Sequence, residues 1–174
     1  MTTYHQWSND DRTTCYYNLA IAELGTETAV RPATVSVNVN HQNHGTEVTA
    51  IGWGQAYIDG EVVNPHSPRK LLMTVIRRND YVTRLRNLIS LNFNFLHDRL
   101  ICAISTPQPA LVIRADIGGP VLDRENNVLG MIAQPCAQLE DPSIYNNSIN
   151  FILSLKNFTA SLNTVTNNDI FKVL

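Results

Sequence analysis

The sequence is short of charge, of basic clusters and of long apolar runs, and each shortage excludes a class of protein. Charged residues occupy 16% of the 174 positions, whereas typical domains have about 25%. The formal net charge is −2, and no Lys/Arg cluster exceeds a pair, so the basic footprint of a nucleic-acid-binding protein is missing. No apolar run approaches the roughly 18 residues of a spanning helix. We therefore expect neither nucleic acid nor membrane as a partner.

Cysteine is scarce, and so are the marks of a signal peptide. The three cysteines are an odd number, which indicates an incomplete disulfide framework. The first seven residues show no basic region followed by an apolar one, so no signal peptide is evident in this sequence. What is present suits a globular core, because a chain of this length with 44% hydrophobic residues can bury about 70% of its extended surface.

Apolar patterning predicts mostly strands. In residues 34–40 valines alternate with polar residues, which is typical of a half-buried strand. Apolar runs predict further strands at 16–24, 47–54, 71–77, 121–122 and 128–132. Turn-forming residues predict a long loop that includes 59–60 and 64–68. Helical spacing predicts a short helix within 79–95 and a second over 149–162.

The most informative stretch is Asp116-Ile117-Gly118-Gly119-Pro120. Two adjacent glycines allow backbone conformations that a Cβ would forbid, and Pro120 stiffens the exit. The polar run 123–127 then turns the chain into a hairpin. A turn of this kind can aim the N–H groups of Ala115 to Gly118 into one small space, which is the geometry of an oxyanion hole.

This stretch resembles the Asp-Ser-Gly-Gly-Pro signature of the trypsin/chymotrypsin-like serine proteases, with Ile117 in place of the nucleophilic serine. Four other blocks resemble family motifs in the right order: 18–24, 49–54, 99–103 and 136–145. The positions of the triad aspartate and serine are 117 − 18 = 99 residues apart here, against about 93 in the family's prototype. The sequence is therefore identified as a member of this family.

The resemblance implies an all-β fold, a chymotrypsin-like antiparallel β-barrel with a C-terminal helix. Members have two six-stranded barrels with the active site between them, and this chain matches the second barrel and the last strands of the first. We expect a single trypsin-like domain, incomplete at its N-terminus, with four parts: a remnant of the first barrel (1–40), the second barrel (41–148), the helix (149–162) and a tail (163–174). The cut barrel would expose strand edges and an apolar face. Rearrangement, a protein partner or a homodimer contact would cover that face.

The resemblance also places the catalytic triad, and no triad position carries its catalytic residue. Ile117 has no lone pair with which to attack a carbonyl carbon. Asn18 replaces the aspartate, a change that alone lowers kcat by about 10⁴ in a related protease. The histidine position, about 45 residues earlier, precedes Met1. Asp116 persists, and we expect its carboxylate to bond neighbouring N–H groups of the turn.

The specificity pocket departs from the family pattern as well. Leu111 stands at the pocket floor, so a basic substrate side chain would meet an apolar wall. The walling segment is Ala133, Gln134 and Pro135, and Pro135 lacks the N–H that pairs with the substrate backbone. Ser143 replaces a glycine of the opposite wall and would narrow the slot. The pocket is therefore expected to be vestigial.

The cysteines fit no complete set of the family's disulfides. Val48 and Asp123 occupy one pair of positions that members usually bridge. Three cysteines remain without their usual partners: Cys15, Cys102 and Cys136. They could bridge among themselves if their Cα atoms lie within about 7 Å, or they could all remain as buried or half-buried thiols.

Three interpretations of function remain open. The first is a catalytically inactive serine protease homologue that acts by protein binding or regulation. The second is a serine-type endopeptidase with a displaced nucleophile such as Ser105 or Ser143. The third is a degenerate or partial gene product. No cofactor is expected, and no metal either, because His41 and His44 have no third ligand nearby. The resemblance implies an extracellular location.

Overall fold

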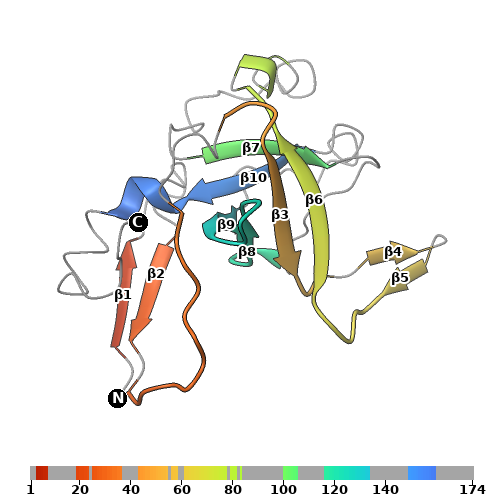
Figure 1. The fold of residues 1–174 in the computed structure, drawn as a ribbon. Coiled ribbons are helices and arrows are strands. Elements are labelled where there is room, and N and C mark those ends of the chain that lie inside the picture. The colour runs from red at the N-terminus through yellow and green to blue at the C-terminus, as the bar shows by residue number, and fades with distance from the viewer. Residues whose placement is uncertain are drawn as a thin grey trace.

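A computed structural model describes eleven stretches of the chain: residues 3–7, 19–23, 25–36, 43–54, 56–58, 61–77, 79–81, 83, 100–105, 116–133 and 149–159. Its main body is a closed antiparallel barrel with the strand order β10-β7-β6-β3-β8-β9 (Figure 1). The bounds are β3 (Glu47–Gly52), β6 (Arg69–Val75), β7 (Leu100–Ser105), β8 (Pro120–Leu122), β9 (Val128–Ala133) and β10 (Ile149–Ser154). The predicted all-β barrel is confirmed.

The barrel encloses one hydrophobic core. Successive side chains of a strand point to opposite faces, so alternate positions of β3 and β6 fill the interior. Ten buried side chains form this core: Val48, Ala50, Met73, Val75, Ile101, Ala103, Val121, Leu129, Ile132 and Ile152. Each large apolar side chain that is fully buried stabilises the fold by roughly 1.5–3 kcal/mol.

Strand β10 corrects the predicted C-terminal helix. All six of its residues are buried. Ile152 joins the barrel core, whereas Phe151 and Leu153 belong to two clusters on the outside. Both faces are thus covered, and apolar residues at every position gave a spacing that also fits a helix. The helical part that follows is the single turn η4 (Leu155–Phe158), a 3₁₀-helix.

A two-stranded hairpin stands beside the barrel, near η4 (Figure 1). It consists of β1 (Thr3–Trp7) and β2 (Leu19–Glu23), paired antiparallel from Thr3↔Glu23 to Trp7↔Leu19. Leu19 is buried in a cluster with Leu153, Leu155 and Phe158. The hairpin is therefore attached to the barrel through the outer face of β10.

The segment after the hairpin runs back to the barrel. Residues 25–34 are exposed. Val35 then forms an isolated parallel bridge with Val128, fixed by Val128 N–H to Thr34 O (2.7 Å) and Ser36 N–H to Val128 O (2.9 Å). The predicted strand over 34–40 is wrong for 34–36, which form only this bridge; 37–40 lie outside the described residues.

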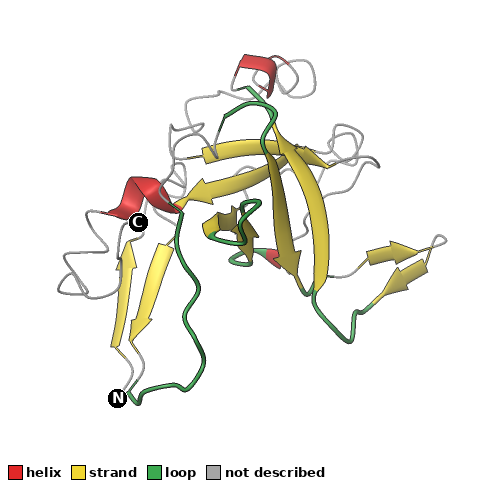
Figure 2. Ribbon diagram, viewed as in Figure 1, coloured by secondary structure: helices red, strands yellow, loops and turns green. Residues whose placement is uncertain are grey.

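Two smaller elements complete the description. A second hairpin, β4 (Ala56–Ile58) and β5 (Glu61–Val63), projects from the barrel where a loop was predicted (Figure 2). Of the predicted helix within 79–95, residues 79–81 and 83 are described and helical, and Tyr81 is buried beside β7 and β10. None of the helical segments in the described stretches has the length and apolar character needed to cross a bilayer.

Candidate functional site

The glycine turn before β8 is fastened to β9 by backbone hydrogen bonds. Gly118 N–H donates to Ile132 O at 2.9 Å, and Ile132 N–H donates to Gly119 O at 2.8 Å. Within the turn, Gly119 N–H donates to Asp116 O at 2.9 Å. Gly118 has φ +86°, a conformation in which a side chain is strained. The turn predicted from the glycine motif is therefore present in the structure.

Asp116 joins this turn to the end of β3. Its Oδ1 accepts a hydrogen bond from the N–H of Gly54 at 2.5 Å. A Cβ on Gly52 or Gly54 would overlap the Asp116 carboxylate, so both positions require glycine. This donor lies outside the turn, 62 positions earlier in the sequence. Two motifs that are far apart in the chain therefore meet at one carboxylate.

Ile117 occupies the tip of the turn, and 37% of it is exposed. Its side chain offers carbon alone to anything that approaches. The N–H groups of Gly118 and Gly119 donate to backbone carbonyls and so hold the turn in place. The exposed tip of the turn is therefore a hydrocarbon side chain.

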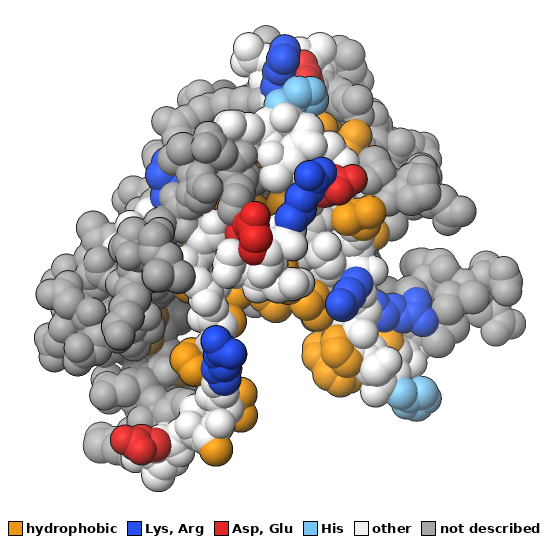
Figure 3. All heavy atoms as spheres, viewed as in Figure 1, with side chains coloured by type: hydrophobic (Ala, Val, Ile, Leu, Met, Phe, Trp, Pro, Cys, Tyr) orange, Lys and Arg blue, Asp and Glu red, His pale blue; other side chains and the backbone are white. Residues whose placement is uncertain are grey.

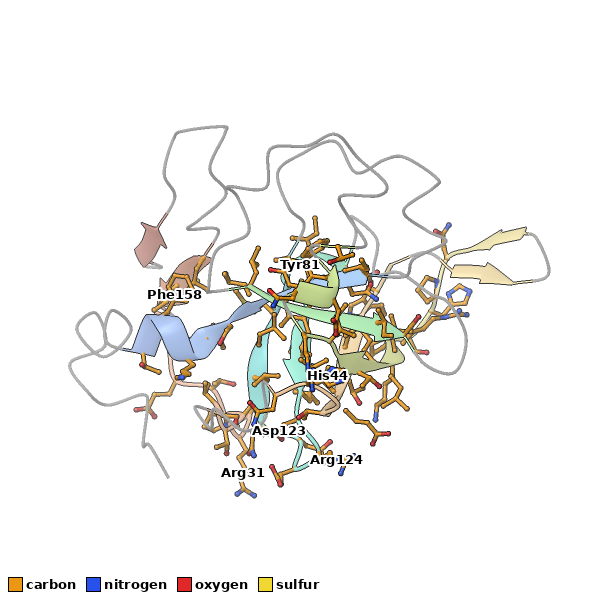
Figure 4. The ribbon with its side chains drawn as sticks, turned by 90° about the horizontal axis from the view of Figure 1, so that it is seen from above. Arg31, His44, Tyr81, Asp123, Arg124 and Phe158 are labelled. Carbon is orange, nitrogen blue, oxygen red and sulfur yellow. The ribbon has the colours of Figure 1, made fainter. Side chains whose placement is uncertain are left out.

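At the other end of β8, the hairpin turn is organised by Asp123, which is 4% exposed. Its Oδ1 accepts hydrogen bonds from the N–H groups of Glu125 and Asn127, both at 2.9 Å. Its Oδ2 accepts a third from Asn127 Nδ2 at 3.3 Å. Asn126 has φ +64°, a left-handed conformation that asparagine tolerates in turns. Figure 4 shows this turn on the same side of the barrel as Arg31 of the segment after the hairpin.

Comparison with family models gives one match, to Trypsin, over residues 3–153. The match covers most of the chain and includes both the glycine turn and the end of β3. The chain belongs to the trypsin family. A search of curated proteins gives no match.

Solved structures of similar fold include members of this family. Neuropsin, a serine protease expressed in the limbic system of mouse brain, has a TM-score of 0.70 at 13% identity over 94% of this chain and 70% of its own. The scabies mite inactivated protease paralogue S-I1 has a TM-score of 0.67 at 15% identity, over 96% and 68%. A mutant of human heparin binding protein has 0.66 at 15% identity, over 99% and 67%. At these identities the likeness shows the fold alone.

With the trypsin-family barrel established, some predicted site residues can be placed. Ile117, Asp116 and Gly118 lie together in the turn, and Ala133 ends β9, half-buried. The others lie outside the described residues: Asn18, Leu111, Ala115, Gln134, Pro135, Ser143, Cys15 and Cys136. For these positions the vestigial pocket and the degenerate triad stay predictions.

Two further positions bear on the alternatives. Cys102 is a buried thiol in β7, 1% exposed, as one of the two cysteine alternatives requires. Ser105 ends the same strand and is buried, with 8% of it exposed. The residue that sequence reasoning missed is Asp123: it stands where family members have a cysteine, and the signal was an aspartate opening a polar turn that contains asparagine.

Proposed function

We propose that this member of the trypsin family is catalytically inactive and acts outside the cell by binding or regulating another protein. The observation that carries the proposal is the half-exposed hydrocarbon side chain of Ile117 at the tip of the glycine turn. Acyl transfer by this family needs a hydroxyl oxygen at that place, a base to take its proton and N–H donors for the oxyanion. Ile117 offers no hydroxyl oxygen at that place.

Two neighbours support the use of this barrel without proteolysis. One is named an inactivated protease paralogue, and another is named for binding heparin. For this chain a protein ligand is favoured over a sulfated polysaccharide, because the net charge is −2 and polyanion binding draws on clustered basic residues. A second copy of the chain is the alternative protein partner.

The experiment is labelling with a serine-directed fluorophosphonate probe, together with a peptide-hydrolysis assay. The wild type is expected to stay unlabelled, with active trypsin as the positive control. Ile117→Ser is expected to stay unlabelled too, because a hydroxyl alone has no base to activate it. Labelling of the wild type, or turnover that rises in proportion to its concentration, would refute the proposal.

The matched control is Val30→Ser, which places a serine at a position that is 75% exposed and remote from the turn. Ile117→Ser and Val30→Ser are expected to react equally slowly. Faster labelling of Ile117→Ser would mean that the turn still activates a nucleophile, and that one substitution alone silenced the enzyme.

A further inference from the structure

The outer face of the β3–β6 strand pair carries two large hydrophobic side chains in contact with solvent. In β3 the buried positions are Val48 and Ala50, so Thr49 and Ile51 point outward. In β6 the buried positions are Met73 and Val75, so Lys70 and Leu72 point outward. Leu72 is 45% exposed, and Trp53, next after the end of β3, is 61% exposed. Exposed hydrophobic groups of this size mark interaction sites when they adjoin one another.

The strand register brings these side chains together. Ile51 pairs with Lys70, and Thr49 with Leu72. Leu72 is therefore a diagonal neighbour of Ile51, and diagonal neighbours lie about 7–8 Å apart. Trp53 follows Ile51 by two residues on the same side. We call these four residues the outer patch: Ile51, Trp53, Lys70 and Leu72.

The charge of this face is positive. Lys70 lies within the outer patch and is exposed, whereas Arg69, the first residue of β6, is on the opposite side of the strand. The only acidic side chain of β3 and β6 is Glu47, at the far end of β3. Glu47 is paired with Arg124 at 3.0 Å. Figure 3 shows hydrophobic side chains adjoining Lys and Arg side chains in the lower right of that view.

We propose that the outer patch docks a segment of the protein partner that presents bulky apolar side chains next to Asp or Glu. The apolar side chains cover Trp53 and Leu72, and the carboxylates face Lys70. This proposal rests on the proposed function and adds the surface and the chemistry of the partner. Charge complementarity of this kind sets specificity and speeds association.

A second copy of this chain is a poorer occupant of the outer patch. A two-fold contact places the same surface on both sides. Lys70 lies between Leu72 and Trp53 and would approach its own symmetry mate. Like charges brought together in an interface cost several kcal/mol. An acidic partner meets no such repulsion.

The test uses a displayed library of random 12-residue peptides as the probe, selected on the purified full chain. Enriched peptides are expected to combine Trp, Phe or Leu with Asp or Glu. Their affinity, measured by fluorescence anisotropy, is expected to fall at least about tenfold for the double variant Trp53→Ser/Leu72→Ser, as for the loss of a binding hot spot. Lys70→Glu is expected to weaken binding and to abolish its salt dependence.

Val30→Ser and Arg31→Glu are the matched controls, because both positions are exposed and lie on another segment. Peptides that bind the double variant as well as the wild type, or that lose affinity equally with the controls, would overturn the proposal. So would a library without enrichment, or a dimer in sedimentation that Trp53→Ser/Leu72→Ser dissociates. Mass spectrometry of the bound peptide separates the two proposals. A cleaved peptide refutes the proposal of an inactive protease. An intact peptide whose affinity is unchanged by the outer-patch substitutions refutes only the proposal that the outer patch is the binding surface.

Discussion

The two turns that flank β8 depart from the trypsin family in opposite ways. The turn before β8 keeps the glycine motif of the family but has Ile117 where the resemblance places the nucleophile, which is the basis of the proposed inactivity. The turn after β8 lacks a disulfide that family members usually have there, and hydrogen bonds hold the turn instead. There Asp123 stands where members have a cysteine, and its carboxylate binds the turn by three hydrogen bonds.

This contrast teaches that the shape of the glycine turn does not depend on the side chain at position 117. The bonds that hold it run between Gly118, Gly119 and Ile132, and from Gly54 to Asp116. None of them uses the side chain of Ile117. A substitution there can abolish chemistry while the barrel remains intact, whereas a substitution among the glycines or at Asp123 acts on the fold.

The largest expected effect is that of Gly119→Ala. The new Cβ would overlap the carbonyl oxygens of Ile51 and Asp116, which are backbone atoms and cannot move aside without shifting β3 and the turn itself. Overpacking of this kind costs about 3 kcal/mol, measured as a lower free energy of unfolding in urea. The control is Gly118→Ala, whose Cβ meets open space. Its only cost is that alanine must adopt the left-handed conformation, which lowers the free energy of unfolding by about 1–2 kcal/mol. A reversed order of the two variants would break the comparison.

A smaller loss is expected from Asp123→Ala. It leaves the N–H groups of Glu125 and Asn127 without their acceptor in a part-buried turn, at a cost of about 2 kcal/mol. Asp123→Asn keeps one side-chain oxygen as an acceptor and should lose less. Urea unfolding measures both variants. Equal stability of Asp123→Ala and the wild type would show that the carboxylate does not support this turn.

The smallest effect is expected from Arg124→Ala. The ion pair with Glu47 is exposed, at 66% and 48% of the two side chains, and exposed pairs contribute about 0.2–1 kcal/mol. The loss should shrink further in 1 M salt, where charges are screened. A loss of stability as large as that of Asp123→Ala would mean that the ion pair between this turn and β3 supports the turn as strongly as the Asp123 carboxylate does.

Much of the fold could be predicted from the sequence because motifs and alternation are local properties. The glycine turn, β3 and β9 lie where their patterns placed them. Strand β10 was mistaken for a helix because both of its faces are buried, so no polar positions mark a period of two. Hairpin β4–β5 was mistaken for a loop, although Asp59-Gly60 between two β-prone runs is a known signal for a tight hairpin.

The candidate site was predicted only in part. The proposed inactivity depends on the identity of Ile117, which can be read from the sequence alone. The bond between Asp116 and Gly54 joins elements 62 positions apart, and the outer patch arises from strand register. Neither contact follows from local sequence patterns, because each depends on how distant strands pair.

Strand β10 also constrains how the protein can be made. It closes the barrel by pairing with β7 on one side and β9 on the other, and it is the last barrel strand in the chain. The other five strands therefore leave the ribosomal exit tunnel before the barrel can close. Until then the nascent chain presents two unpaired edges, which favour aggregation. Chaperone demand during translation is thus expected to depend on how soon residues 149–154 emerge from the exit tunnel.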